Sequence, residues 1–330
     1  MSILSSLGLV PKAVVVDEVP PPSLNRLLRQ VADGAYHDAE KLLHSLNAEN
    51  RECLIHAFSR QDDAVALAQQ WVRNRSGASI AHTMLGASMI ASAWKIRGST
   101  YADAVDEQAW EPFHRGLERA AQPLLEASRL DTAAADPLAW LIVAEVGKSG
   151  DRDLIDDYFA QATARVPSHW PTYYKYFMAT TEKWGGSHKE MFRFAQKSAE
   201  GAPRGSMLHC LMALAYCEYA LALEGEIDQQ VRGASHAARI SAALYAWLDA
   251  SPATLEDRLN ALSGGFATLG LNHFTVACYL CGADDEARML LAALNGEITV
   301  VPWAWIADGM RESRHYGFVH DRVQRELARA

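Results

Sequence analysis

Basic residues are scarce in this sequence of 330 residues, and they form no block anywhere along it. The chain has 31 Lys and Arg against 40 Asp and Glu, for a formal net charge of −9. Binding to nucleic-acid phosphates requires a basic surface, so we expect no nucleic-acid partner. Cysteine is also scarce, with five residues, an odd count. Their mostly apolar surroundings favour reduced, buried thiols over a disulfide framework.

Long apolar runs and targeting signals are missing as well. The longest mainly apolar run, residues 207–223, contains His209 and Glu218, which are costly inside a bilayer. The N-terminus lacks the basic start and the cleavage site of a secretory signal. We therefore expect a cytoplasmic protein with no membrane partner, in which residues 207–223 form a buried helix.

The common signatures of chemistry are absent too. The sequence has no His-Glu-x-x-His and no histidine pair four residues apart, no phosphate-binding or dinucleotide-binding glycine loop and no nucleophile elbow. The one Cys-x-x-Cys, from Cys278 to Cys281, has no second pair and lies in an apolar segment of helical character. We predict no metal and no cofactor. The common enzyme classes are disfavoured, and an unusual enzyme is left as an alternative.

Helical periodicity dominates what is present. From Ser23 onward, apolar residues recur every three or four positions in segments rich in Ala, Leu, Glu, Arg and Gln. Only residues 14–16 and 298–301 form β-branched runs, and both are short. Frequent Gly and Pro breakers indicate short turns between antiparallel neighbours. The sequence thus predicts an all-α fold with a Pro-containing extended leader (1–22), a helical array (23–296) and a C-terminal helical cap (297–330).

Internal similarity supports a repeat architecture. Residues 34–43 and 282–291 both read Gly-Ala, two variable residues, an acid, Ala, two variable residues and Leu-Leu. The glycine can turn the chain into a helix, and the small alanine lets another helix approach closely. In addition, breakers that begin helices recur at equal intervals, at Pro137, Pro171 and Gly205.

The best-formed unit, residues 136–167, has Trp140 on its first helix, Gly150 at the turn, and Ala162 and Pro167 at the end of its second. This pattern resembles the tetratricopeptide repeat, whose unit of ~34 residues matches the interval between those breakers. The segment 76–136 does not follow it. The resemblance implies an irregular tetratricopeptide-like α-solenoid of helix pairs.

In tetratricopeptide repeats, the first helix of each unit lines a concave binding face. The resemblance therefore implies a groove with aromatic anchors, and we predict that a protein or peptide binds there without catalysis. Aromatic rings are strong anchors, but they dominate core packing as well, so packing between helices is the alternative for each ring. The predicted binding residues are Trp140, Lys148, Tyr174, Met178, Glu182, Trp184 and His188.

The Trp-Gly-Gly-Ser sequence at 184–187, followed by Met191 and Phe194-Ala195, also resembles a bacterial domain family of unknown function. That resemblance implies no activity. Locally, Ser187 can cap the helix that follows, and the glycine amides could instead bind an anion.

The second functional hypothesis is an enzyme or a small-ligand binder with a pocket near the Trp184-Gly185-Gly186 turn. Glu218 lies on an apolar helix face, where a carboxylate is either paired or protonated. Glu145 has a similar position, and the ionisation of both is left open. His188, His209 or Glu218 would then act as acid or base.

Overall fold

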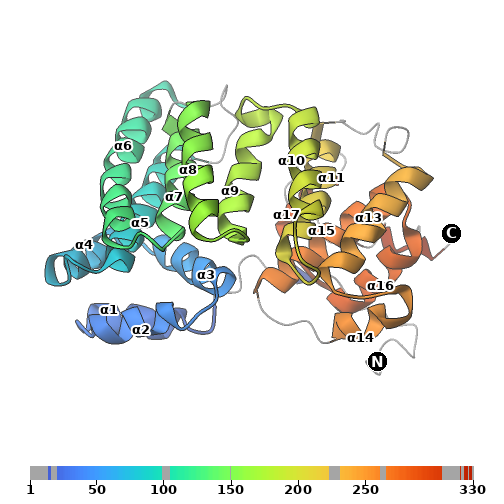
Figure 1. Ribbon diagram of the computed structural model, residues 1–330, viewed down its shortest axis with the longest axis horizontal. Coiled ribbons are helices and arrows are strands. Elements are labelled where there is room, and N and C mark those ends of the chain that lie inside the picture. The colour runs from blue at the N-terminus through green and yellow to red at the C-terminus, as the bar shows by residue number, and fades with distance from the viewer. Residues whose placement is uncertain are drawn as a thin grey trace. The chain divides into compact units, whose positions relative to one another are not determined.

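The structure is a computed structural model that describes residues 14–15, 21–98, 105–148, 150–222, 231–260, 265–306, 320, 323–325 and 327–328. Apart from one pair of two-residue strands, the secondary structure of these residues is helical, as the sequence predicts (Figure 1). Contacts divide the chain into two compact units, residues 20–186 and residues 1–19 with 187–330. We call them the 20–186 unit and the 187–330 unit and describe each by itself. Their boundary falls inside the range 23–296 that the sequence analysis treats as one array.

The 20–186 unit is built from helices joined mostly by short turns. They are α1 (Leu24–Ala32), α2 (Tyr36–His44), α3 (Ala48–Ser59), α4 (Ala64–Asn74), α5 (Ser79–Arg97), α6 (Glu107–Leu130), α7 (Asp136–Lys148), α8 (Arg152–Arg165), α9 (Trp170–Thr180) and the 3₁₀ helix η3 (Glu182–Trp184). A continuous core runs through this unit, with Phe58, Trp71 and Phe113 fully buried in it.

The 187–330 unit also consists mainly of helices. They are α10 (His188–Glu200), η4 (Met207–His209), α11 (Cys210–Ala222), α13 (Ala234–Trp247), η5 (Pro252–Thr254), α14 (Leu255–Asn260), α15 (Gly265–Cys281), α16 (Asp284–Leu294), α17 (Val300–Trp303) and η6 (Ala304–Ile306). Nearly every residue of α11 is buried, which confirms the buried helix expected from the apolar run at 207–223.

Two short strands at the β-branched runs noted in the sequence pair over two positions, Val14 with Glu297 and Val15 with Ile298. Strand β1 (Val14–Val15) lies parallel to β2 (Glu297–Ile298). The sequence gives no indication of this pairing, because the two runs lie near opposite ends of the chain. The other residues of the predicted leader up to 20 lie outside the described residues, and so does much of the predicted cap after Ile306.

Two turns between successive helices, each containing the Gly-Ala motif, close with the same hydrogen bonds. The alanine amide donates to the carbonyl oxygen five residues earlier, at 2.7 Å for Ala35 and 2.9 Å for Ala283. The glycine amide donates to the carbonyl oxygen three residues earlier, at 3.2 Å for Gly34 and 3.3 Å for Gly282. Both glycines have positive φ, 75° and 83°, which favours glycine at the end of a helix. The α1–α2 and α15–α16 turns therefore share one geometry, as the similar sequences predict.

We expect Gly34→Ala to lower the free energy of unfolding by ~1 kcal/mol, because a side chain at φ 75° is strained. Urea unfolding measures the loss. Gly77→Ala is the control, since this exposed turn glycine has no positive φ and no atom within 4 Å of an added Cβ. An equal loss in both variants would contradict the assigned turn.

Helices α7 and α8 form the pair that residues 136–167 predict, with Gly150 at the turn (φ 65°) and Ala162 fully buried. The segment 76–136 departs from the repeat for a physical reason. Helices α5 and α6 have 19 and 24 residues, so the pair alone is longer than one repeat unit of ~34 residues. They pack closely at Gly86, where an added Cβ would lie 2.4 Å from Leu124 Cγ.

Candidate functional site

Helices α7 and α9 pack against each other, as the predicted binding groove requires, but Trp140 does not line an open surface. Its exposed fraction is 4%, and it belongs to the core of the 20–186 unit. The ammonium group of Lys175 lies over its ring, 4.4 Å from the centroid. Helices α5, α6 and α8 also pack on α7, which leaves its aromatic residue no free face. The prediction for Trp140 is therefore corrected to interhelical packing.

The other predicted binding residues of this unit have more varied surroundings. Tyr174 is half-buried and stacks on Trp170 with ring centroids 5.7 Å apart. Met178 is half-buried, and Glu182 is exposed on η3. Lys148 forms an ion pair with the buried Glu145 at 2.7 Å, and the hydrogen bond to that carboxylate raises the pKa of Lys148. The binding role of these four residues remains a prediction.

A buried polar cluster joins α3, α7 and α9 beside Trp140. Lys175 of α9 forms an ion pair with Glu52 of α3, and the two side chains are only 7% and 8% exposed. Next to it, Asp136 of α7 accepts hydrogen bonds from the Arg51 guanidinium at 2.9–3.3 Å and lies 3.5 Å from His169 Nε2. The cluster ties three helices together through charges.

The electrostatics of Asp136 favour its charged form. Burial by itself would raise its pKa, but the contacts with His169 and Arg51 outweigh burial and lower the pKa to about 2. His169 also shares a hydrogen bond of 2.8 Å with Thr172 Oγ1. An acid, a histidine and a hydroxyl in a chain suggest an activated nucleophile. Thr172, however, is fully buried, so the arrangement supports structure and not catalysis.

A second cluster, at the surface of the same unit, combines three half-buried tryptophans from α5, α6 and η3. We call Trp94, Trp110 and Trp184 the tryptophan cluster. The rings of Trp94 and Trp184 meet edge to face with centroids 5.6 Å apart. The Arg97 guanidinium lies 5.3 Å from the Trp94 centroid and 5.4 Å from the Trp110 centroid. The fully buried Phe113 supports Trp94 from the core at 4.9 Å.

The turn after Trp184 explains why two glycines stand there. Gly185 has φ 86° and ends η3. At Gly186 an added Cβ would lie 2.1 Å from the backbone oxygen of Thr180. The Gly185 and Gly186 amides donate hydrogen bonds within the turn, at 3.1 and 3.0 Å. The amides that could have bound an anion therefore already have acceptors in the turn. Ser187 Oγ caps α10 by accepting from the Glu190 amide at 3.2 Å, as predicted.

Of the tryptophan cluster, sequence reasoning identified Trp184 and missed the other members. Trp94 stands near the end of α5, and Trp110 stands near the start of α6. No periodicity brings them together, so only the packing of α5 on α6 could reveal them. The one available signal was composition, because tryptophan and arginine are the residues most enriched at binding hot spots.

The candidate acid–base residues of the second hypothesis lie in the 187–330 unit, whereas Trp184 belongs to the other unit. His188 is half-buried and meets Tyr219 edge to face at 4.8 Å. His209 is buried with Nε2 3.0 Å from the Pro203 oxygen, and burial lowers its pKa. Glu218 is 6% exposed. The pocket of that hypothesis stays a prediction.

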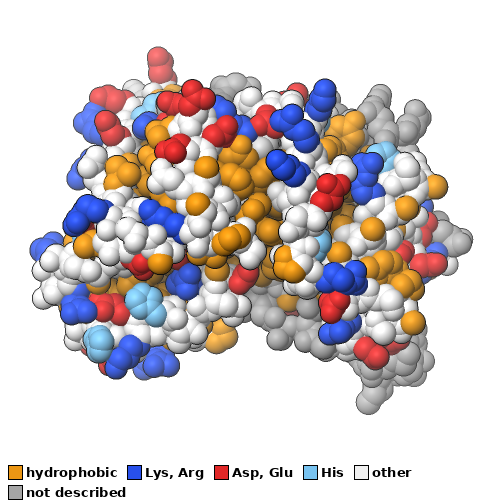
Figure 2. All heavy atoms as spheres, in the orientation of Figure 1, with side chains coloured by type: hydrophobic (Ala, Val, Ile, Leu, Met, Phe, Trp, Pro, Cys, Tyr) orange, Lys and Arg blue, Asp and Glu red, His pale blue; other side chains and the backbone are white. Residues whose placement is uncertain are grey.

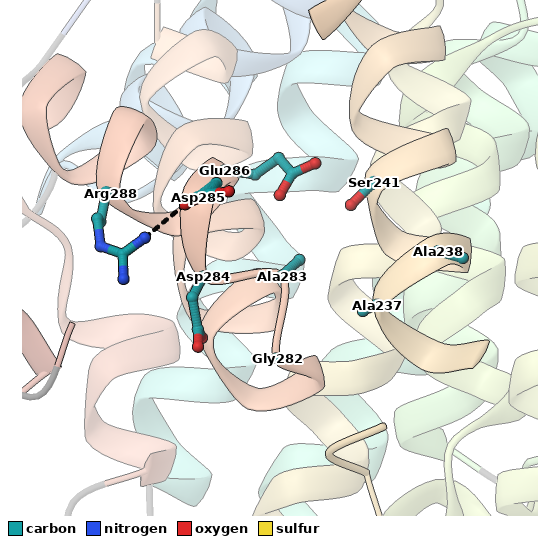
Figure 3. A pocket seen from close by; sticks show the side chains of 9 residues that line it. All are labelled: Ala237, Ala238, Ser241, Gly282, Ala283, Asp284, Asp285, Glu286 and Arg288. Atoms are coloured by element: carbon teal, nitrogen blue, oxygen red, sulfur yellow. Dashed lines mark hydrogen bonds and ion pairs between the residues drawn. The ribbon is translucent and has the colours of Figure 1, made fainter. Parts of the chain in front are cut away.

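An open pocket of about 410 Å³ lies in the 187–330 unit between α13 and the start of α16 (Figure 3). Small side chains, including Ser241, line the α13 side, and Asp284, Asp285 and Glu286 line the other. One oxygen of each acid is already engaged: Asp284 pairs with Arg232 at 2.6 Å, Asp285 with Arg288 at 2.5 Å, and Glu286 accepts from Tyr245 Oη at 2.7 Å. Acids in a first helical turn also stabilise the helix dipole, so folding accounts for their presence.

All five cysteines are free, as predicted, and four are buried: Cys210, Cys217, Cys278 and Cys281, with Cys53 half-buried. Burial raises the pKa of every one of these thiols, to about 12 for Cys53 and Cys281. Cys278 and Cys281 lie inside α15, so they do not form the reactive pair of a redox motif.

We expect a thiol reagent to modify the native protein at least ~100-fold more slowly than the denatured protein, because buried thiols react only after local opening. Mass spectrometry of the labelled cysteines over time gives both rates. Cys53 should react first. Comparable native and denatured rates would contradict the buried placement.

Among the residues that the structure describes, no group of His, Cys, Asp or Glu is arranged to hold a metal ion. No described helix combines the length and apolar character needed to cross a membrane. No family model matches the chain, and no curated protein sequence matches it.

Proposed function

We propose that this chain is a non-catalytic helical-repeat module of the cytoplasm, whose partner is a protein or peptide. In the proposal, its helix pairs are antiparallel and stack as an irregular tetratricopeptide-like array. Such stacks commonly serve as extended binding surfaces. Its support is the all-helical fold, the shared geometry of the two Gly-Ala turns and the α7–α8 pair.

The observation that carries the proposal is the tryptophan cluster. Three half-buried indoles and one guanidinium gather on the surface of the 20–186 unit. Tryptophan and arginine supply much of the binding energy at protein interfaces, where they are enriched in central pockets. We propose that an apolar segment of the partner packs on these rings, with Tyr174, Met178 and Glu182 as further binding residues.

Site-specific photo-crosslinking tests the proposal. A photoreactive phenylalanine analogue replaces Lys183, the exposed neighbour of Trp184 in η3, so that the three indoles stay in place. Irradiation of the full chain in an extract of the source cells is followed by mass spectrometry. The matched control carries the analogue at Leu125 of α6, which is 44% exposed and outside the cluster. We expect a discrete protein adduct at position 183 and none at 125. No adduct at 183, or the same adduct at both positions, would contradict the proposal.

A further inference from the structure

A row of basic side chains runs along the outer face of α10. Lys189, Arg193 and Lys197 follow one another at intervals of four residues, and all three are exposed. None of them forms an ion pair with a residue that the structure describes. We call these residues the basic ridge. Basic side chains gather where Figure 1 draws α10, as Figure 2 shows. The opposite face of the helix is buried through Met191 and Ala195.

Helix stability explains Lys197, a cation in the last turn of α10, but it does not explain Lys189. Lys189 is the second residue of α10 after the cap at Ser187, and a cation near a helix N-terminus opposes the helix dipole. Helix α16 has the favourable arrangement, with Asp284, Asp285 and Glu286 in its first turn. Glu190 in the same turn offsets part of this effect. A residue that breaks a local rule is nevertheless typical of a functional position. The ridge is also a positive row on a chain of net charge −9.

We propose that the basic ridge binds an acidic polypeptide segment whose carboxylates stand one helical turn apart. Residues four apart on a helix are separated by ~6 Å along its axis. An acidic helix with Glu or Asp at every fourth position can therefore place one carboxylate opposite each of the three cations of the ridge. The inference goes beyond the proposed function, because the ridge and the tryptophan cluster belong to different compact units and each is tested by its own variants.

The length of the ridge and the net charge of the chain favour an acidic peptide over a nucleic acid or an anionic membrane. Its three charges span only ~12 Å along the helix, whereas recognition of an anionic membrane typically uses about four to eight basic residues. A chain with a net charge of −9 is repelled at long range by a nucleic acid or an anionic bilayer. A short segment with a few carboxylates experiences much less of this repulsion.

The test uses the full chain and two labelled alanine-based helical peptides of equal composition. One carries glutamate at every fourth position, and the other has the same glutamates out of register. Fluorescence anisotropy at low and physiological salt gives both affinities. We expect the in-register peptide to bind more tightly than the out-of-register peptide, with an affinity that falls as salt rises.

The triple variant Lys189→Glu, Arg193→Glu and Lys197→Glu should weaken binding of the in-register peptide about tenfold or more, as expected for three exposed ion pairs that become repulsive. The control, Arg26→Glu, Arg73→Glu and Arg119→Glu, makes the same charge change at exposed sites on three other helices. It should retain most of the affinity.

Three results would overturn the proposal. They are equal binding of both peptides, an equal loss in the two triple variants, and ridge-dependent binding of oligothymidylate or phosphatidylserine vesicles that exceeds peptide binding. Circular dichroism and thermal unfolding of each variant show whether it is folded. Should the triple variant fail to fold, the neutral variant Arg193→Gln replaces it and should still weaken binding by a smaller factor.

Discussion

Lys175→Met is expected to lower the free energy of unfolding by about 3–5 kcal/mol, because it leaves the carboxylate of Glu52 buried without its cation. Both side chains are buried, so water cannot replace the lost partner. The variant also loses the contact of the ammonium with the Trp140 ring, which adds to the cost. Urea unfolding followed by circular dichroism measures the loss.

The double variant Glu52→Met/Lys175→Met is the matched control. A buried ion pair replaced by apolar side chains of similar volume is often neutral or stabilising. We therefore expect the double variant to recover most of the loss. Equal stability of Lys175→Met and the parent protein would contradict the buried pair. A double variant less stable than Lys175→Met would show that the two side chains also stabilise the fold in ways other than neutralising each other's charge.

Asp136→Asn is expected to lower the free energy of unfolding by roughly 2 kcal/mol at neutral pH. The pKa of Asp136 falls from 3.8 to about 2 in the folded protein, so its ionised form stabilises the fold. This stabilisation is fully present above pH ~4 and is lost as the pH falls towards 2. The difference between parent and variant should therefore shrink over that range, as urea unfolding at several pH values can measure.

Asp62→Asn provides the control in the same unit. Asp62 forms an ion pair with Lys95, but its side chain is fully exposed, and exposed pairs contribute little to stability. We expect its thermal unfolding midpoint to change much less than that of Asp136→Asn. A stability difference for Asp136→Asn that stays constant from neutral pH to pH 2 would contradict the assigned role of its charge.

Local patterns in the sequence predicted those parts of the fold that depend on neighbouring residues. The Gly-Ala motifs predicted the turns at Gly34 and Gly282. A glycine with positive φ and the helix that follows it depend only on neighbouring residues. Ser187 was predicted as a cap for the same reason. Apolar surroundings along the chain also sufficed to predict that most cysteines are buried.

The rest depends on packing between distant segments. The sequence around Trp140 is compatible with a position in a groove or in a core. The packing of four neighbouring helices determines that Trp140 is buried. The buried cluster joins Glu52 to Lys175 across 123 residues, and no spacing rule connects them. The same is true of Trp94 and Trp184, whose rings meet only because the fold places η3 against α5.

The affinity of Trp184→Ala for the protein captured at position 183, measured by isothermal titration calorimetry, tests the central claim most directly. We predict a loss of at least ~30-fold in affinity, as expected for an interface anchor, with a thermal unfolding midpoint close to that of the parent. Trp140→Phe, a change in the core, should retain the affinity. Undiminished binding by Trp184→Ala would contradict the claim that the tryptophan cluster is the binding surface.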